Sequence, residues 1–115
     1  MIGSGYVGLV SGACFAEFGA NVTCVDKDEH KINALLKGEI PIYESGLDDL
    51  VARNVKAGRL GFSIELEDTV KHADLVFIAV GTPTRRGDGH ADLKYVYAAA
   101  EEIAGYLAHY TVIVD

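Results

Sequence analysis

The sequence predicts a doubly wound α/β sheet, and two observations support that prediction. Amphipathic helical segments alternate along the chain with short apolar segments, an order that produces parallel strands joined by right-handed crossovers. One of the short segments, Leu75–Val80, is apolar at every position, as expected of a central parallel strand that helices cover on both faces. The length of 115 residues is that of one domain.

The predicted elements begin with a strand, a helix and a second strand. Met1–Ile2 reads as the end of the first strand, and we expect the earlier part of that strand to be missing from the sequence. Apolar residues recur at helical spacing from about Tyr6 to Phe18. Four of them define the face that we expect to be buried: Val7, Val10, Cys14 and Phe18. Val22–Val25 then forms a buried strand that ends at Asp26.

Two helices and a third strand follow. Glu29–Lys37 is a polar helix. Ser45 and Asp48 have the spacing of a capping box, so we expect the next helix to begin after Ser45 and to end near Gly58. The residues that we expect on its buried face are Leu47, Leu50, Val51 and Val55. Leu60–Ile64 completes this part as a short strand.

The last part of the chain contains the clearest helical pattern. Asp68–His72 predicts a short helical turn, and a glycine-rich loop over Gly81–Ala91 follows the apolar strand. The segment Leu93–Leu107 has apolar residues at helical spacing over four turns. These residues are Leu93, Val96, Tyr97, Ala100, Ile103, Ala104 and Leu107. Tyr110–Val114 is the final apolar strand.

Charge and cysteine content narrow the classes of partner and location. A formal net charge of −7 argues against nucleic acid, which requires a basic face. No apolar run approaches the roughly 18 residues of a membrane span, and no basic region precedes an apolar one as in a signal peptide. Cys14 and Cys24 form no C-x-x-C pair, and we interpret them as reduced buried thiols in a cytoplasmic protein.

The segment from Gly3 to Gly8 has the pattern G-x-G-x-x-G, between a strand and a helix. Gly3 permits a tight turn out of the strand, and Gly5 lets the backbone approach a pyrophosphate without an intervening Cβ. Gly8 lets the helix lie close against the sheet. Exposed N–H groups and the positive end of the helix dipole then stabilise phosphate. The pattern predicts a dinucleotide-binding loop of the Rossmann type.

Asp26 indicates which dinucleotide binds. It ends the second strand, about twenty residues beyond the glycines, where a carboxylate accepts hydrogen bonds from the adenosine ribose hydroxyls. Its charge repels a 2′-phosphate, so we expect NAD rather than NADP. Lys27 weakens that repulsion, but no arginine follows to hold a phosphate. The alternative is an ordinary tight turn with a solvated Asp26.

A second loop, Gly81–Thr84, follows the apolar strand, and ligands of open parallel sheets bind beyond such strand ends. Thr82 offers a hydroxyl group there. Arg85 and Arg86 either meet phosphate or are solvated loop charges, and we favour the second interpretation. The histidines have spacings that make no metal site, and no nucleophile turn supports a Ser-His-Asp site: His30, His72, His90 and His109.

Three segments in this order resemble the UDP-glucose/GDP-mannose dehydrogenase family: Gly3–Leu9, Ile40–Leu47 and Phe77–Pro83. Ser45 stands where that family usually has proline. Together, the glycine loop and the resemblance give the candidate NAD-binding residues, which are Gly3, Gly5, Tyr6, Val7, Gly8, Asp26, Lys31 and Thr82.

The resemblance also implies an activity. The family oxidises the C6 alcohol of a nucleotide sugar to a carboxylate with two molecules of NAD, through a thiohemiacetal on a cysteine. We expect that cysteine and a lysine to lie outside this chain, so no residue here is catalytic. Residues 1–115 are then an NAD-binding domain, incomplete at both ends, of a homo-oligomeric parent that also binds UDP-glucose.

Two alternatives remain open at this point. One keeps the family and changes the sugar nucleotide to GDP-mannose or UDP-N-acetylmannosamine, since the choice of UDP-glucose depends mainly on Ile40–Leu47. The other is a free-standing NAD-sensing regulatory module, which needs neither that segment nor Gly81–Pro83.

Overall fold

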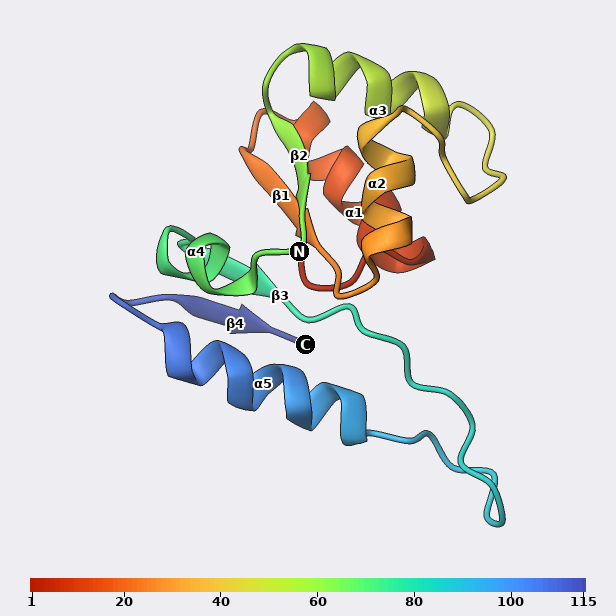
Figure 1. Ribbon diagram of the computed structural model, residues 1–115, viewed down its shortest axis with the longest axis vertical. Coiled ribbons are helices and arrows are strands. Elements are labelled where there is room, and N and C mark those ends of the chain that lie inside the picture. Colours follow the sequence, from red (N-terminus) through yellow and green to blue (C-terminus); the bar gives the residue numbers. More distant parts are fainter.

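Parallel strands alternate with helices along the chain. The computed structural model describes residues 1–115 (Figure 1). Its elements are α1 (Tyr6–Glu17), β1 (Val22–Val25), α2 (Glu29–Leu36), α3 (Leu47–Lys56), β2 (Leu60–Ser63), α4 (Leu66–Lys71), β3 (Leu75–Phe77), α5 (Lys94–Tyr106) and β4 (Val112–Val114). None of these helices combines the length and the hydropathy needed to cross a membrane.

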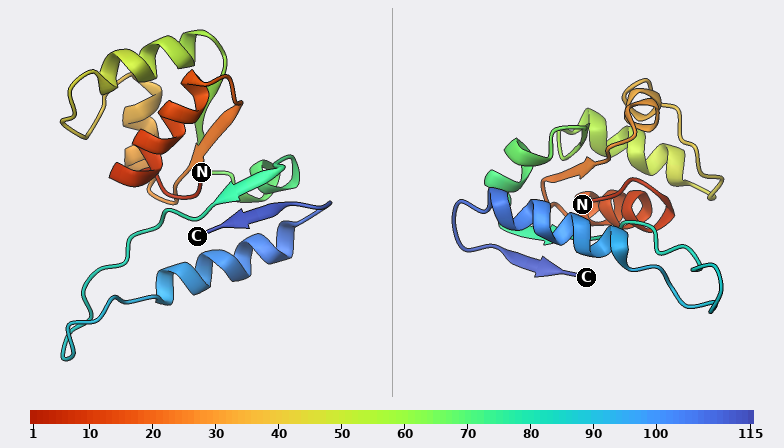
Figure 2. Two further views of the ribbon diagram at one scale, coloured as in Figure 1. Left: turned by 180° about the vertical axis from the view of Figure 1, so that it is seen from behind. Right: turned by 60° about the horizontal axis from the view of Figure 1, so that its bottom comes forward.

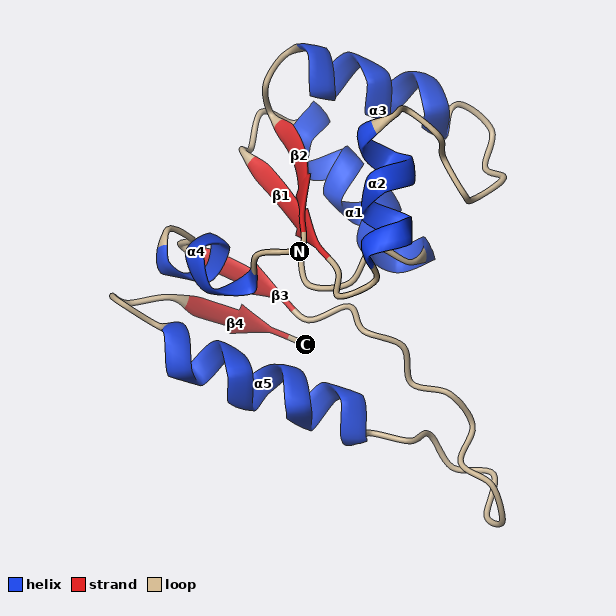
Figure 3. Cartoon of the chain, viewed as in Figure 1, coloured by secondary structure: helices blue, strands red, loops and turns tan.

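Ile2 joins two pairs of parallel strands. β1 pairs with β2, and β3 pairs with β4 (Figure 3). Ile2 makes parallel bridges to both Val25 and Ile78, so it lies between β1 and β3. The amide of Ile2 donates to the carbonyl of Phe77, and the amide of Val25 donates to the carbonyl of Met1, each at 2.8 Å. The resulting order is β2, β1, Ile2, β3, β4, with all neighbours parallel.

Helices cover both faces of this sheet, and two consecutive residues of β1 show it. Cys24 packs in a cluster with apolar side chains of α1, α2 and α3, whereas Val25 packs in a second cluster with those of α4 and α5. Side chains of adjacent strand residues point to opposite faces, so the two clusters lie on opposite sides of the sheet. Figure 1 shows α1 to α3 gathered beside β1 and β2, and α5 beside β4. The predicted doubly wound α/β class is confirmed.

The buried face of α1 differs from the prediction. Val7 and Phe18 are 63% and 87% exposed, and Val10 and Cys14 are only half-buried. The buried residues are Gly8, Leu9, Gly12, Ala13 and Ala16. Most residues on this face are small, and small side chains let the helix lie close to the sheet. Of the bulkier residues that helical spacing singled out, Val7 and Phe18 point to solvent, whereas Val10 packs at the edge of the core cluster.

The start of α3 also differs from the predicted capping box. Gly46 is the N-cap, in the left-handed region with φ +80°, and no side chain caps the helix. Ser45 lies outside the helix because the chain turns at Gly46, a conformation that glycine adopts readily. Leu47 and Val51 are buried as expected, but Val55 is 44% exposed.

A buried polar residue, Asn54, takes the place on α3 that an apolar residue was expected to fill. Its amide nitrogen donates to Glu17 Oε2 at 2.7 Å and to the carbonyl of Leu50 at 2.9 Å. Its oxygen accepts from Arg59 Nη2 at 3.0 Å. Asn54 is fully buried and fully hydrogen-bonded, and it links α3 to α1.

The later elements keep their predicted type, with shifted boundaries and faces. α4 begins at Leu66, before the predicted Asp68, and the regular part of β3 ends at Phe77. On α5 the buried residues are Ala99 and Ile103, whereas Tyr97, which we expected on the buried face, is 62% exposed. The segment between β3 and α5 projects from the rest of the molecule, as Figure 2 shows.

We predict that Gly12→Ala destabilises the domain although alanine favours helix. A Cβ at Gly12 would lie 2.8 Å from Cys24 Sγ on β1, so α1 would have to move away from the sheet. Overpacking of this kind costs about 1–3 kcal/mol. The matched control is Gly105→Ala on α5, where a Cβ meets nothing within 4 Å. Urea unfolding should show a loss for Gly12→Ala and no loss for Gly105→Ala, and equal effects would contradict the packing argument.

Candidate functional site: a dinucleotide pocket

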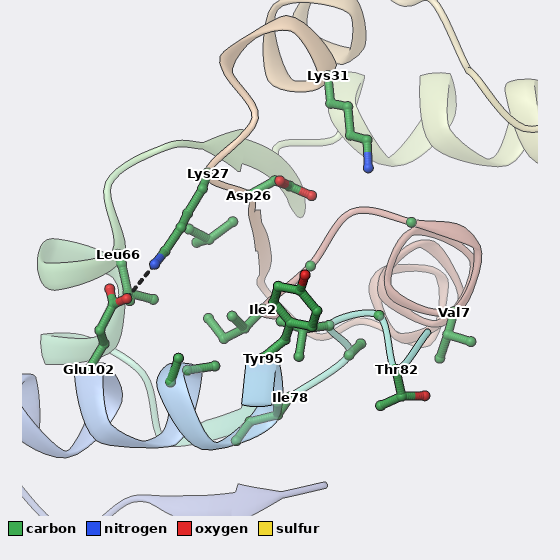
Figure 4. A pocket seen from close by; sticks show the side chains of 18 of the residues that line it. Ile2, Val7, Asp26, Lys27, Lys31, Leu66, Ile78, Thr82, Tyr95 and Glu102 are labelled. Atoms are coloured by element: carbon green, nitrogen blue, oxygen red, sulfur yellow. Dashed lines mark hydrogen bonds and ion pairs between the residues drawn. The ribbon is translucent and has the colours of Figure 1, made fainter. Parts of the chain in front are cut away.

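A pocket of about 910 Å³ opens where the strands end, between the glycine loop, the end of β1, the segment after β3 and one face of α5 (Figure 4). This volume is within the usual range for sites that bind small molecules. Seven of the eight candidate residues line it: Gly3, Gly5, Tyr6, Val7, Asp26, Lys31 and Thr82. Gly8 does not. The structure therefore brings together residues that are up to 79 positions apart in the sequence.

The three glycines of the loop have different structural roles. Gly3 has φ +104°, and a Cβ there would lie 2.5 Å from the carbonyl oxygen of Ala79 in the segment after β3. A Cβ at Gly8 would lie 1.9 Å from the carbonyl oxygen of Gly3. Gly8 thus lets α1 rest on the backbone of the loop, whereas we expected it to rest on the sheet. The close approach of α1 to the sheet belongs to Gly12, which the sequence analysis missed.

The side of Gly5 where a side chain would lie is open space, and a pyrophosphate can bind to the loop only if that space is free. It lines the pocket, and a Cβ added to it would meet no protein atom within 4 Å. The side of Gly5 that is left bare is thus free for a ligand to approach the backbone. A pyrophosphate needs a surface of this kind, and the loop supplies it.

The first turn of α1 is free to bind an anion. Gly5 is its N-cap, no side chain caps the helix, and the first turn contains no acidic residue. The N–H groups at the start of a helix lack partners within the helix and carry partial positive charge. By contrast, Asp28 caps α2 by accepting from the amides of His30 and Lys31. The start of α1 thus retains the donors that phosphate oxygens bind.

Asp26 is fixed by three hydrogen bonds at the end of β1. One carboxylate oxygen accepts from the amide of Ser4 at 2.9 Å and from its hydroxyl at 2.7 Å, and the other accepts from the amide of Asp28 at 2.9 Å. Burial acts to raise the pKa of this carboxyl. The hydrogen bonds from Asp28 and Ser4, together with the charge of Lys31, outweigh that effect, and the pKa lies below its ordinary value. Asp26 is therefore charged at neutral pH.

Ser4 is a site residue that the sequence analysis passed over. It is buried, and it ties the glycine loop to Asp26 through both its amide and its hydroxyl. The only signal in the sequence was a small hydroxyl residue between Gly3 and Gly5. Through this contact the position of Asp26 depends on the conformation of the loop.

The part of the pocket beside the end of β1 includes a face of α5 that we did not predict as part of the site. Its residues recur at helical spacing: Tyr95, Ala98, Ala99 and Glu102. Ile64 and Leu66 add apolar surface from the segment after β2. An apolar slot of this kind suits a purine base. The sequence does show these residues at helical spacing, but the face of α5 that we predicted to be buried lies elsewhere around the helix.

Arg85 and Arg86 do not line the pocket. Arg85 forms an ion pair with Asp88, and its amide donates to the carbonyl of His90 at 2.6 Å, so its partners lie within its own loop. This supports the interpretation of these arginines as loop charges.

Neither cysteine lines the pocket, and burial raises the pKa of the Cys24 thiol to about 11.

Comparison with known proteins identifies relatives that share this site region. The sequence profile described as "UDP-glucose/GDP-mannose dehydrogenase family, NAD binding domain" matches residues 1–115. A UDP-glucose 6-dehydrogenase of Rhizobium meliloti is 68% identical over 114 residues, which are 99% of this chain and 26% of that protein. UDP-glucose 6-dehydrogenase TuaD of Bacillus subtilis is 53% identical over 115 residues, 100% of this chain and 25% of that protein.

A solved structure shows the same fold. The UDP-glucose dehydrogenase of the archaeon Pyrobaculum islandicum superimposes with a TM-score of 0.83 at 42% identity, over 89% of this chain and 23% of that one. The chain thus spans about a quarter of the length of the relatives that it matches.

We predict that Asp26→Asn weakens NAD binding by about tenfold, the size expected when a hydrogen bond to a charged acceptor is lost. The same change should narrow the preference for NAD over NADP, because the charge that repels a 2′-phosphate is gone. Titration calorimetry with both dinucleotides measures both effects. The control is Asp48→Asn, an exposed carboxylate on α3 outside the pocket. Unchanged NAD affinity in Asp26→Asn would rule out contact between this carboxylate and the cofactor.

Proposed function

Because the chain belongs to the UDP-glucose/GDP-mannose dehydrogenase family and matches its NAD-binding domain, we propose that it forms the cofactor-binding domain of a UDP-glucose 6-dehydrogenase. The observation that supports this most directly is the convergence of the glycine loop, Asp26, Lys31 and Thr82 on one pocket. NAD bound there supplies the acceptor for the hydride that leaves the sugar alcohol.

The pocket suggests how the cofactor lies. The pyrophosphate contacts the loop at Gly5 and the start of α1, where donors are free. Asp26 and Lys31 hold the adenosine ribose, with the carboxylate accepting from its hydroxyls. Val7 and Thr82 lie on the opposite side of the glycine loop from Asp26, as Figure 4 shows, and we assign them to the nicotinamide half.

The relatives support the choice of UDP-glucose as the sugar nucleotide. UDP-glucose is supported by 68% and 53% identity to two proteins named as UDP-glucose 6-dehydrogenases. We place the catalytic cysteine and lysine of the family outside these residues, as the resemblance implies, and neither Cys14 nor Cys24 lines the pocket. Both cysteines are free, which is typical of cytoplasmic proteins, and we propose this location. We also propose that the whole protein is a homo-oligomer.

An assay of the protein from the complete gene tests this function. UDP-glucose should support NADH formation, with two NADH for each sugar nucleotide oxidised to the acid. GDP-mannose and UDP-N-acetylmannosamine, supplied separately, are the controls for substrate class. A higher kcat/KM with either control would overturn the choice of UDP-glucose, and binding of NAD without oxidation of any of the three would favour a regulatory module.

A further inference from the structure

An ion pair closes the adenosine end of the pocket, and no motif of the sequence indicates it. The amino group of Lys27, just after β1, pairs with Glu102 Oε1 on α5. The two residues are 75 positions apart, and both line the pocket. Figure 4 shows the pair spanning the space between the end of β1 and the helix, above Leu66.

Lys27 occupies a position that matters for cofactor choice because it directly follows Asp26. In sites of this type an arginine near the ribose accommodates the 2′-phosphate of NADP, and a lysine at the same place would supply the same charge. Lys27 is 78% exposed and long enough to turn toward either side of the chain. Its orientation therefore decides whether its charge lies at the ribose or elsewhere.

Glu102 directs that charge elsewhere. In Figure 4 the side chain of Lys27 runs from the chain toward Glu102, while the carboxylate of Asp26 points toward Lys31. The charge of Lys31 is one of the causes that lower the pKa of Asp26, whereas the amino group of Lys27 pairs with Glu102. The ribose side of the pocket thus has the Asp26 carboxylate with one cation beside it.

We propose that Glu102 is a positioning residue for cofactor selection: by holding Lys27 at the adenine rim, it keeps this cation away from the ribose 2′ position and so favours NAD over NADP. The proposal rests on the NAD placement proposed above. Direct repulsion between the carboxylate of Glu102 and a 2′-phosphate is the alternative explanation for the same preference. The two explanations predict different results when Lys27 is removed.

Glu102→Gln tests the proposal, because glutamine keeps the size of the side chain and removes the ionic tether. The ratio of the NADP to the NAD dissociation constant should fall about threefold, a modest change because exposed ion pairs are weak. The matched control is Glu101→Gln, which removes the same charge from an exposed neighbour outside the pocket and should leave the ratio unchanged. Titration calorimetry on the wild-type chain and each variant gives the ratios, and circular dichroism checks the fold.

A second variant separates the tether from the charge of Glu102 itself. Lys27→Met keeps most of the apolar stem and removes the cation. In the Glu102→Gln background it should return the ratio to the wild-type value, whereas Lys27→Met alone should change the ratio little. A ratio that stays low in the double variant would contradict the role of Lys27. Equal ratios in Glu102→Gln and Glu101→Gln would overturn the proposal as a whole.

Failure of the proposed function has a different signature. If the wild-type chain binds NAD and Glu102→Gln leaves the ratio unchanged, only the positioning role of Glu102 is wrong. If the folded wild-type chain binds neither dinucleotide, the placement of NAD is wrong, and the role of Glu102 falls with it.

Discussion

The close contact between the start of α1 and the backbone of the glycine loop determines the geometry on which the site depends. Gly8 has no side chain, so the helix rests on the carbonyl of Gly3, where a Cβ would come within 1.9 Å. Gly3 in turn lies against the carbonyl of Ala79. Gly12 continues the contact by packing on Cys24 of β1. Three bare positions thus place the positive end of α1 beside the ends of β1 and β3, where the pocket opens.

Asp26 is the residue to which we assign the selectivity for NAD. The hydrogen bonds from Ser4 hold the carboxylate against the loop, so the group that we assign to the ribose is tied to the groups that we assign to the pyrophosphate. The net charge of the chain is −7, yet an anionic ligand is still accommodated, since backbone N–H groups and a helix dipole attract it locally. Local dipoles, rather than the overall charge, decide what binds here.

Sequence patterns predicted the type and order of the elements, because these depend on local periodicity. They also predicted the glycine loop and Asp26, because a tight turn and the end of a strand are local features too. They failed where the outcome depends on how elements meet. Helical spacing assigned the buried face of α1 to large residues, but the close approach selects Gly8, Gly12 and Ala16. The pairing of Lys27 with Glu102 joins positions that no local pattern connects. Gly46 rather than Ser45 is the N-cap of α3, because the turn there requires a residue in the left-handed region.

The binding of the NAD pyrophosphate to the glycine loop at the start of α1 is the central claim, and amide NMR shifts during titration with NAD test it most directly. The account predicts that the largest shifts fall on the amides of Gly5, Tyr6 and Val7, with smaller ones at Asp26 and Thr82. Gly58 and His72, which line a groove between β1 and β3, are the internal reference, since neither residue lines the pocket. Unchanged amides in the glycine loop, together with shifts at Gly58 and His72, would contradict the account.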